Sequence, residues 1–491
     1  MARSLDLRVD DGQTLELQES RTTARERIPD DVEPQDDELV NVATIEPVPP
    51  NGGYAWVCTF AVFLINAHTW GVNSSWAVFM AHFSSHDTPI KGTHLELGLI
   101  GGLSISQALM ISTLATLVRK HIGARWTMCL GSILIFLSLL TSSFATQVWH
   151  LFLSQGLCFG WGMGFAYVTA ASTLPPWFST RRSLAYGLAT SGAGIGGLVY
   201  SVATNAIIQS LGWEWAYRII AFCALGANMT SSALLKEFGH RQRVADELKF
   251  NMGAFRRVEV LLIVAWGAAT ELGYIILLYS LPTYASSIGL TASQGAISSA
   301  LLNLGLALAR PLVGYTSDTY GRINMAWILT GLCTVFCFGL WIPASNFASL
   351  VAFSLISGAL CGTFWCTVTP VVAEVVGIRE LASTFGAICI FLVVPTTFAE
   401  AVAMALVRDS SGGSFINAQI FVGFMFLLGT VSLWFLRSWK VFDIEQLENG
   451  EESHGGAGAR ITVEGSSPSS RLNKYGVRWL TPRLLFSSGR V

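Results

Sequence analysis

The chain contains few charged residues: Asp, Glu, Lys and Arg make up only 13% of its 491 residues. Soluble globular chains carry roughly 25%, so this composition excludes an ordinary soluble domain. Hydrophobic residues reach 52%, and they stand in long runs rather than in short alternations. Such runs cross a bilayer as helices, whose backbone groups are all paired within one segment. We therefore predict an all-α integral membrane protein.

Sequence features of several other functions are also absent. There is no phosphate-binding GxxxxGK[ST] loop, which argues against ATP as the direct energy source. All nine cysteines lie in apolar stretches without disulfide or metal spacing. We therefore expect their side chains to be buried as small hydrophobic groups. We expect that the protein is not an enzyme and that it uses no cofactor, no metal and no nucleic-acid partner. The first fifty residues lack the apolar core of a signal peptide, so the first membrane span is expected to target the chain.

Twelve apolar segments are each long enough to cross a hydrocarbon core, which takes about 20 helical residues. They are residues 54–80, 94–118, 125–145, 148–172, 184–208, 215–235, 258–284, 292–316, 323–343, 347–370, 381–406 and 416–437. A polar connector, residues 236–257, separates them into two blocks of six. Similar proline-then-basic motifs follow the fourth segment of each block, at residues 175–187 and 370–386. Weak internal similarity of this kind is typical of transporters built from repeats.

This division predicts five regions. They are a disordered acidic tail (1–50), an N-terminal six-helix bundle (51–235), the connector (236–257), a C-terminal six-helix bundle (258–440) and a second disordered tail (441–491). The basic residues lie mostly on one side of the predicted membrane, in the even-numbered loops. They are Arg119, Lys120, Arg125, Arg181, Arg182, Arg241, Arg243, Lys249, Arg256, Arg257, Arg322 and Arg379. By the positive-inside rule, both termini and the connector are cytosolic.

Arg310 stands in the middle of the eighth segment, among Leu, Ala, Gly, Val and Pro. A guanidinium at that depth is costly and requires a polar path or a charged partner. Asn303 lies seven residues earlier, on the same helical face. The pair is interpreted as part of a polar cavity in which Arg310 receives an anionic solute in bidentate fashion. The alternative is a fixed structural pair between Arg310 and Glu271 or Glu400.

Two acidic residues lie well inside predicted spans, away from their ends. Glu271 is midway along the seventh segment, and Glu400 follows Pro395 in the eleventh. Tyr274, one turn from Glu271, joins Arg310, Asn303, Asn66, Asn73 and Trp365 as the residues predicted to bind substrate. Intramembrane carboxyls are either protonated or paired. Both are candidates for proton coupling; the alternatives are a structural hydrogen bond for Glu271 and a place near the outer interface for Glu400.

Further polar and aromatic residues are candidates for the cavity wall. Asn66, Trp70 and Asn73 recur at helical spacing in the first segment, with His68 on a neighbouring stripe, and Trp365 is an aromatic candidate in the tenth. The alternative for His68 is a structural hydrogen bond. Glycines at every fourth position, Gly156 to Gly164 and Gly192 to Gly196, are interpreted as close helix-packing surfaces.

Several motifs resemble those of monocarboxylate transporters, a family within the major facilitator superfamily. The stretch Asn51-Gly52-Gly53-Tyr54-Ala55-Trp56 resembles the family's first signature, and residues 177–196, which begin Trp177-Phe178, resemble its second. Arg310-Pro311, Gly314, Asp318 and Gly321-Arg322 are similar to the superfamily pattern after span eight. The resemblance covers residues 50–440 and is closest to fungal members. It implies twelve helices in two bundles that open alternately, with Arg310 as the anion-binding residue.

The chain departs from the animal proton-coupled members at three positions. Asn51 replaces the signature acid, Ser74 stands where those members carry Lys, and Leu306 stands where they carry Asp one turn before the arginine. Either Glu271 takes over proton coupling or transport is facilitated diffusion.

The resemblance also implies gating residues in the cytosolic loops, namely Asp318, Arg322, Arg181 and Arg182, a monomer, and residence in the plasma membrane. The predicted function is transport of a small organic anion, such as a monocarboxylate. The competing hypotheses are efflux of a fungal secondary metabolite, carriage of a larger vitamin-like solute, a non-transporting nutrient receptor and an intramembrane enzyme.

Overall fold

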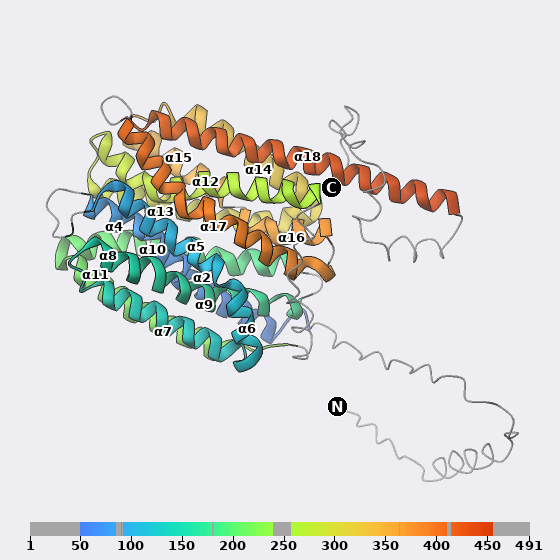
Figure 1. Cartoon of the computed structure of the whole chain (residues 1–491), viewed down its shortest axis with the longest axis horizontal. Coiled ribbons are helices and arrows are strands. Elements are labelled where there is room, and N and C mark those ends of the chain that lie inside the picture. Colours follow the sequence, from blue (N-terminus) through green and yellow to red (C-terminus); the bar gives the residue numbers. More distant parts are fainter. Residues whose placement is uncertain are drawn as a thin grey trace, which may run out of the picture. The chain divides into compact units, whose positions relative to one another are not determined.

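The computed structural model describes residues 50–84, 90, 92–178, 181–238, 257–362, 364–376, 378–409 and 414–454. Across these residues the regular elements are helices and no strand occurs, which confirms the all-α prediction (Figure 1). Apart from residue 50, the predicted N-terminal tail lies outside the described residues, as do residues 239–256 of the connector.

The N-terminal half contains α2 to α11. Its helices are α2 (Tyr54–His68), α3 (Trp70–Ser74), α4 (Trp76–Phe83), α5 (His94–Met110), α6 (Ser112–Ile122), α7 (Ala124–Ser142), α8 (Val148–Leu151), the π-helix η1 (Phe152–Cys158), α9 (Phe159–Thr173), the short η2 (Pro175–Trp177), α10 (Arg182–Leu211) and α11 (Trp213–Leu234).

The C-terminal half contains α12 to α18. Its helices are α12 (Val258–Ser287), α13 (Ala292–Tyr320), α14 (Arg322–Phe336), the π-helix η5 (Cys337–Trp341), α15 (Phe347–Cys361), α16 (Phe364–Val376), α17 (Ile378–Asp409) and α18 (Ile416–His454). We expected a disordered tail from residue 441, but α18 continues to His454. Buried Val441, Phe442 and Asp443 extend its packed face beyond the predicted span.

All twelve predicted segments coincide with helices. Within the described ranges, ten helical segments are long and apolar enough to cross a membrane, or eleven if α5 and α6, bent by 46° at their junction, form one span. The sixth predicted segment forms α11, which has 22 residues but is not among these spans. Its Arg218 and Asn228 lower its mean hydropathy, so α11 depends on neighbouring helices to shield polar groups.

The first span is broken into α2, α3 and α4 by side chains that compete for backbone carbonyls. The Thr69 hydroxyl donates to the Ile65 carbonyl at 2.6 Å, and the Ser75 hydroxyl donates to the Val72 carbonyl at 2.6 Å. Back-bonding of Ser and Thr in this way bends helices. The break sets the direction of Trp70 and of the residues around it.

The two halves meet along two close contacts, here named the α10–α13 seam and the α5–α17 seam. In the α10–α13 seam a Cβ on Gly194 would lie 2.5 Å from the Asn303 carbonyl oxygen. In the α5–α17 seam a Cβ on Gly102 would lie 2.2 Å from the Thr397 carbonyl oxygen. Both distances are shorter than real side chains tolerate, so the backbones can pack this closely only because these positions lack a side chain.

The glycine repeats predicted from the sequence do serve close packing. A Cβ on Gly160 would lie 2.6 Å from the Ser104 carbonyl oxygen on α5. A Cβ on Gly192 or Gly196 would meet carbonyl oxygens of α2 at 2.1 and 2.2 Å. These contacts hold helices of the N-terminal half together.

Candidate functional site

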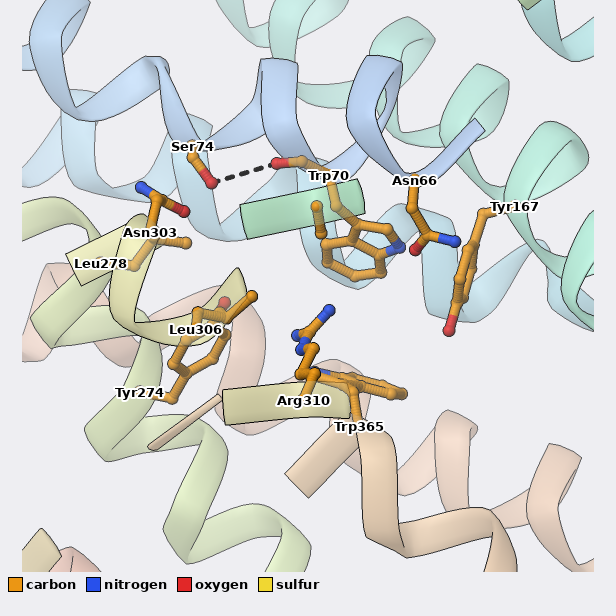
Figure 2. Close-up of a pocket in the computed structure, with 11 residues that line it drawn as sticks. Asn66, Trp70, Ser74, Tyr167, Tyr274, Leu278, Asn303, Leu306, Arg310 and Trp365 are labelled. Atoms are coloured by element: carbon orange, nitrogen blue, oxygen red, sulfur yellow. Dashed lines mark hydrogen bonds between the residues drawn. The ribbon is translucent and has the colours of Figure 1, made fainter. Parts of the chain in front are cut away.

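A cavity lies among helices of both halves, around Arg310 (Figure 2). It is lined by Asn66, Trp70, Ser74, Tyr167, Ala193, Tyr274, Leu278, Asn303, Leu306, Arg310 and Trp365. The side chains approach so closely that the open space between them admits about one water molecule. A solute therefore enters only after these side chains separate.

Five of the six residues predicted to bind substrate are in this lining. They are Arg310, Asn303, Asn66, Tyr274 and Trp365. Leu306, which stands in the place of the family's Asp, also lines the cavity. Ser74, the counterpart of the family's Lys, faces the same space and donates to the Trp70 carbonyl at 3.1 Å (Figure 2).

Arg310 is a buried cation held by backbone carbonyls. Its side chain is 4% exposed; Nε donates to the Gly362 carbonyl at 3.1 Å, and Nη1 donates to the Thr190 carbonyl at 2.7 Å. Within the described residues it makes no ion pair. A guanidinium has five N–H groups, and two of them are used in these bonds. The charge is thus positioned by both halves while three N–H groups stay available.

Glu271 is the acidic residue near this cation. It is 1% exposed and lies close to the Trp365 indole, within electrostatic range of Arg310. Neither of its carboxylate oxygens has a hydrogen-bond partner among the described residues. Buried polar atoms are rarely left so, which marks this carboxyl, beside the cavity-lining Trp365 but outside the lining itself, as a candidate functional group.

Aromatic side chains of both halves face each other across the cavity. The Trp70 ring lies 5.4 Å from Tyr167, at an interplanar angle of 89°, and 5.8 Å from Trp365. Figure 2 shows the Trp70 indole directly above the tip of the Arg310 side chain. Aromatic faces attract cations and apolar groups. The cavity therefore combines one positive charge with aromatic walls.

The two cavity amides are anchored by their own helices. Asn66 Nδ2 donates to the Val62 carbonyl and Asn303 Nδ2 donates to the Ser299 carbonyl, both at 2.9 Å. The amide oxygens are the acceptors that these bonds leave unused. They can receive a hydroxyl or N–H group of a solute.

Asn73, the sixth predicted residue, lies outside the cavity lining. Its Nδ2 donates to the Tyr279 hydroxyl at 2.7 Å, and its Oδ1 accepts from the Ser104 hydroxyl at 2.8 Å. Asn73 thus connects α3 with α5 and with α12 of the other half. Sequence reasoning missed Tyr279, because the two partners are 206 residues apart and no spacing signals such a contact.

The remaining intramembrane candidates also lie away from the lining. Glu400 is fully buried, and its Oε1 accepts from the Ser280 hydroxyl at 2.8 Å. His68 Nδ1 pairs with the Tyr200 hydroxyl at 2.6 Å, which matches the structural alternative. No group of three or more His, Cys, Asp or Glu with metal-binding geometry occurs among the described residues.

The predicted gating residues lie at helix ends. Arg181 is exposed and immediately precedes α10, which begins at Arg182. Arg322 begins α14 and is half-buried. Asp318 falls in the last turn of α13. The side chains of Arg182 and Asp318 are outside the described part of the chain, so their gating role stays a prediction.

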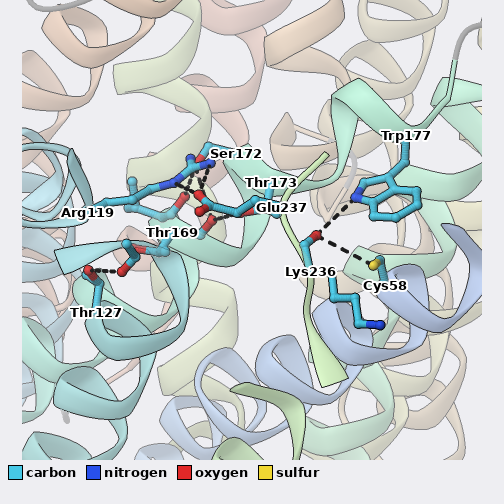
Figure 3. Close-up of polar contacts among 11 residues, drawn as sticks. Cys58, Arg119, Thr127, Thr169, Ser172, Thr173, Trp177, Lys236 and Glu237 are labelled. Atoms are coloured by element: carbon cyan, nitrogen blue, oxygen red, sulfur yellow. Dashed lines mark hydrogen bonds and ion pairs between the residues drawn. The ribbon is translucent and has the colours of Figure 1, made fainter. Parts of the chain in front are cut away.

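The two signature motifs contact each other and hold the segment that follows α11; Figure 3 shows the contacts of that segment with Trp177 and Arg119. The Asn51 N–H donates to the Trp177 carbonyl at 3.2 Å, and Trp177 Nε1 donates to the Lys236 carbonyl at 3.1 Å. Lys236 Nζ lies 4.3 Å above the Tyr54 ring. Glu237 forms a 2.9 Å ion pair with Arg119. The motifs therefore attach the start of the connector to the N-terminal half.

Comparisons with known proteins agree with this architecture. Residues 55–399 match the sequence profile described as Major Facilitator Superfamily. The chain is 32% identical over 398 residues to "Probable transporter MCH2" of Saccharomyces cerevisiae, covering 79% of this chain and 84% of that protein. It is 25% identical over 447 residues to human "Monocarboxylate transporter 12", covering 82% of this chain and 84% of the relative.

Among solved structures, the chain is similar to a partially occluded, inward-open form of the xylose transporter XylE from E. coli. The TM-score is 0.60, with 14% identity over 78% of this chain and 99% of that one. At this identity the likeness supports the fold alone.

Proposed function

The chain belongs to the Major Facilitator Superfamily, and from this premise we propose that it carries an organic anion through the cavity around Arg310. The family confirms that the protein is a multi-pass membrane transporter and not an enzyme, and that its transport is secondary. The resemblance to monocarboxylate transporters is confirmed as well.

The observation that carries the proposal is the uncompensated charge of Arg310. Its two hydrogen bonds go to neutral carbonyls, so the positive charge has no ion-pair partner within the described residues. The Nη2 amino group and one N–H of Nη1 take no part in these bonds, and a guanidinium can present two such groups to a carboxylate as a bidentate pair. A buried charge of this kind is stabilised strongly by an arriving anion.

The lining favours an anion with an organic body. Trp70, Tyr167, Tyr274 and Trp365 contribute ring faces that an inorganic anion would leave in contact with water. Ring faces gain free energy when an apolar or planar group covers them. We therefore expect carboxylates with a hydrophobic or aromatic portion to bind more tightly than the shortest carboxylates.

Glu271 is the proposed coupling residue. In the absence of solute it lies within electrostatic range of Arg310 but forms no ion pair with it. When an anion pairs with Arg310, a charged Glu271 would add an uncompensated negative charge in the same buried space. Like charges in one site favour uptake of a proton by one of them. Proton binding at Glu271 and anion binding at Arg310 then occur together, which gives symport of one proton with one anion.

We also propose an orientation and a location. The basic loops place both termini and the connector in the cytosol, and the family's usual location is the plasma membrane. Arg181, Arg182, Asp318 and Arg322 would then stabilise the cytosolic gate when it is closed. The transporter is proposed to act as a monomer.

Counterflow in proteoliposomes tests the proposal. Vesicles loaded with a panel of aliphatic and aromatic carboxylates and fungal metabolites are mixed with labelled solute, with and without a pH gradient. We expect exchange of at least one carboxylate, accelerated by the gradient. Arg310→Ala should abolish exchange, and Glu271→Gln should keep exchange but lose the acceleration.

Arg218→Ala is the matched control. Arg218 lies on α11, where its guanidinium stacks at 4.9 Å on Phe144 and 5.1 Å on Trp215, remote from the cavity. Its loss should leave exchange intact. Normal exchange by Arg310→Ala, in protein that reaches the membrane and unfolds at the wild-type temperature, would refute the anion-binding role.

A further inference from the structure

Glu400 is a buried carboxyl in the α5–α17 seam, apart from the cavity. It is 0% exposed. Oε1 accepts a hydrogen bond from Ser280 at 2.8 Å, whereas Oε2 has no partner among the described residues. The proposed symport through the cavity does not use this group.

The seam around Glu400 is closed by backbone contact. A Cβ on Gly98 of α5 would lie 3.2 Å from Glu400 Cγ and 3.3 Å from the Ala401 nitrogen. One turn further along α5, a Cβ on Gly102 would overlap the Thr397 carbonyl oxygen at 2.2 Å. With α5 and α17 in contact at Glu400 and one turn before it along α17, water reaches Glu400 only when the seam opens.

No cation in the described part of the chain compensates Glu400 in the closed seam. It makes no ion pair among the described residues, and α12 contributes Ser280 and the hydroxyl of Tyr279, which lies in electrostatic range. Four other helices pack against α17, and each carries an ionisable side chain. These side chains are Glu96 on α5, Arg119 on α6, Glu374 on α16 and Arg437 on α18.

These groups do not replace a counter-ion. Glu96 is held in the Thr93 helix cap, where it accepts from the Thr93 N–H at 2.8 Å. Arg119 is paired with Glu237, and Arg437 Nε donates to Asn324 at 2.6 Å. The Arg408 side chain, near the end of α17, is outside the described residues. A charged Glu400 in the closed seam would thus be desolvated with a single hydrogen bond, an arrangement that strongly favours the neutral acid.

We infer that Glu400 is a second coupling residue, which binds a proton when the α5–α17 seam closes and releases it when the seam opens. In the closed state the carboxyl is neutral; on opening, its O–H bond breaks, the proton passes to water on that side of the membrane, and the carboxylate is hydrated. The inference rests on the proposed function only in taking the proton as the coupling ion. It assigns Glu400 to the gate and Glu271 to the solute cavity.

Hydrogen–deuterium exchange of the full-length protein in lipid nanodiscs tests this without any solute. After correction for intrinsic chemical exchange, protection of the amides of residues 97–104 should fall as the pH rises. Since one proton is released on opening, the open-to-closed ratio should rise about tenfold per pH unit over the titration range. Glu400→Gln should remove this dependence, because its amide still accepts from Ser280 but cannot ionise.

Two further variants keep the test decisive. Glu374→Gln, on the half-buried face of α16, is the matched control and should retain the wild-type pH dependence. Ser280→Ala removes the one bond that stabilises a charged Glu400 in the closed seam. The pH range over which protection falls should therefore extend to higher pH.

The inference would be overturned if protection in the wild-type protein did not vary with pH. It would also be overturned if Glu400→Gln kept the wild-type pH dependence of protection, or if Ser280→Ala left the pH range of that dependence unchanged. These outcomes are independent of the solute. If no anion is exchanged in counterflow, the proposed function fails while the seam measurement still decides the role of Glu400.

Discussion

Adding a single methyl group at Gly102 should open the α5–α17 seam. The Cβ of Gly102→Ala would lie 2.2 Å from the Thr397 carbonyl oxygen and 2.7 Å from that of Thr396. Ordinary contacts begin at 3.4 Å, so the two backbones must separate locally by 3.4 − 2.2 = 1.2 Å. The obstructing atoms belong to the backbone, and no rotation of a flexible side chain can relieve the overlap.

The size of the effect is set by the cost of overpacking. An extra methyl group in a tightly packed contact costs about 1–3 kcal/mol. The gain in helix propensity from Gly to Ala, about 1 kcal/mol, is the same whether the seam is open or closed, so it cancels from the comparison. At 1.36 kcal/mol per factor of ten, the closed-to-open ratio should fall about 5- to 150-fold.

Hydrogen–deuterium exchange at residues 97–104 and 396–403 measures this ratio. We expect faster exchange in Gly102→Ala on both helices. Gly226→Ala is the control, because a Cβ on Gly226 of α11 would meet no atom within 4 Å. Equal protection in the two variants would refute the view that the seam is held closed by direct backbone contact.

Three further changes test other contacts. Asn73→Leu removes the polar partner of Tyr279 and should destabilise the purified protein by about 1–3 kcal/mol in thermal unfolding; wild-type stability would mean that this contact does not hold the halves together. Arg119→Glu should lower the free energy of unfolding by no more than about 1 kcal/mol, since the pair with Glu237 is partly exposed. The double variant Arg119→Glu, Glu237→Arg should regain that stability. Trp70→Ala should lower the counterflow affinity for an aromatic carboxylate about 2- to 12-fold more than for lactate; equal losses would contradict its role as a ring contact.

The first span shows where sequence periodicity stops being informative. Helical spacing placed Asn66, Trp70 and Asn73 on one face, as a straight helix of 3.6 residues per turn would. The hydroxyl groups of Thr69 and Ser75 break the helix, and the lining instead contains Asn66, Trp70 and Ser74. Asn73 is turned toward the other half.

The membrane spans and the intramembrane charge of Arg310 were determined by the sequence alone. Crossing a bilayer requires about twenty consecutive apolar residues, a local property that is fully visible in the chain. The cost of an ionisable group within such a run is equally local, which is why Arg310, Glu271 and Glu400 could be identified as candidates.

Only the tertiary structure decided which of these groups act together. Arg310 is positioned by the carbonyls of Thr190 and Gly362, and Asn73 is paired with Tyr279; these contacts join residues 52 to 206 positions apart. The same packing placed Glu271 beside the cavity-lining Trp365 and Glu400 in the seam. Contacts between distant helices depend on the angle and depth at which those helices meet, and no spacing along one segment encodes that geometry.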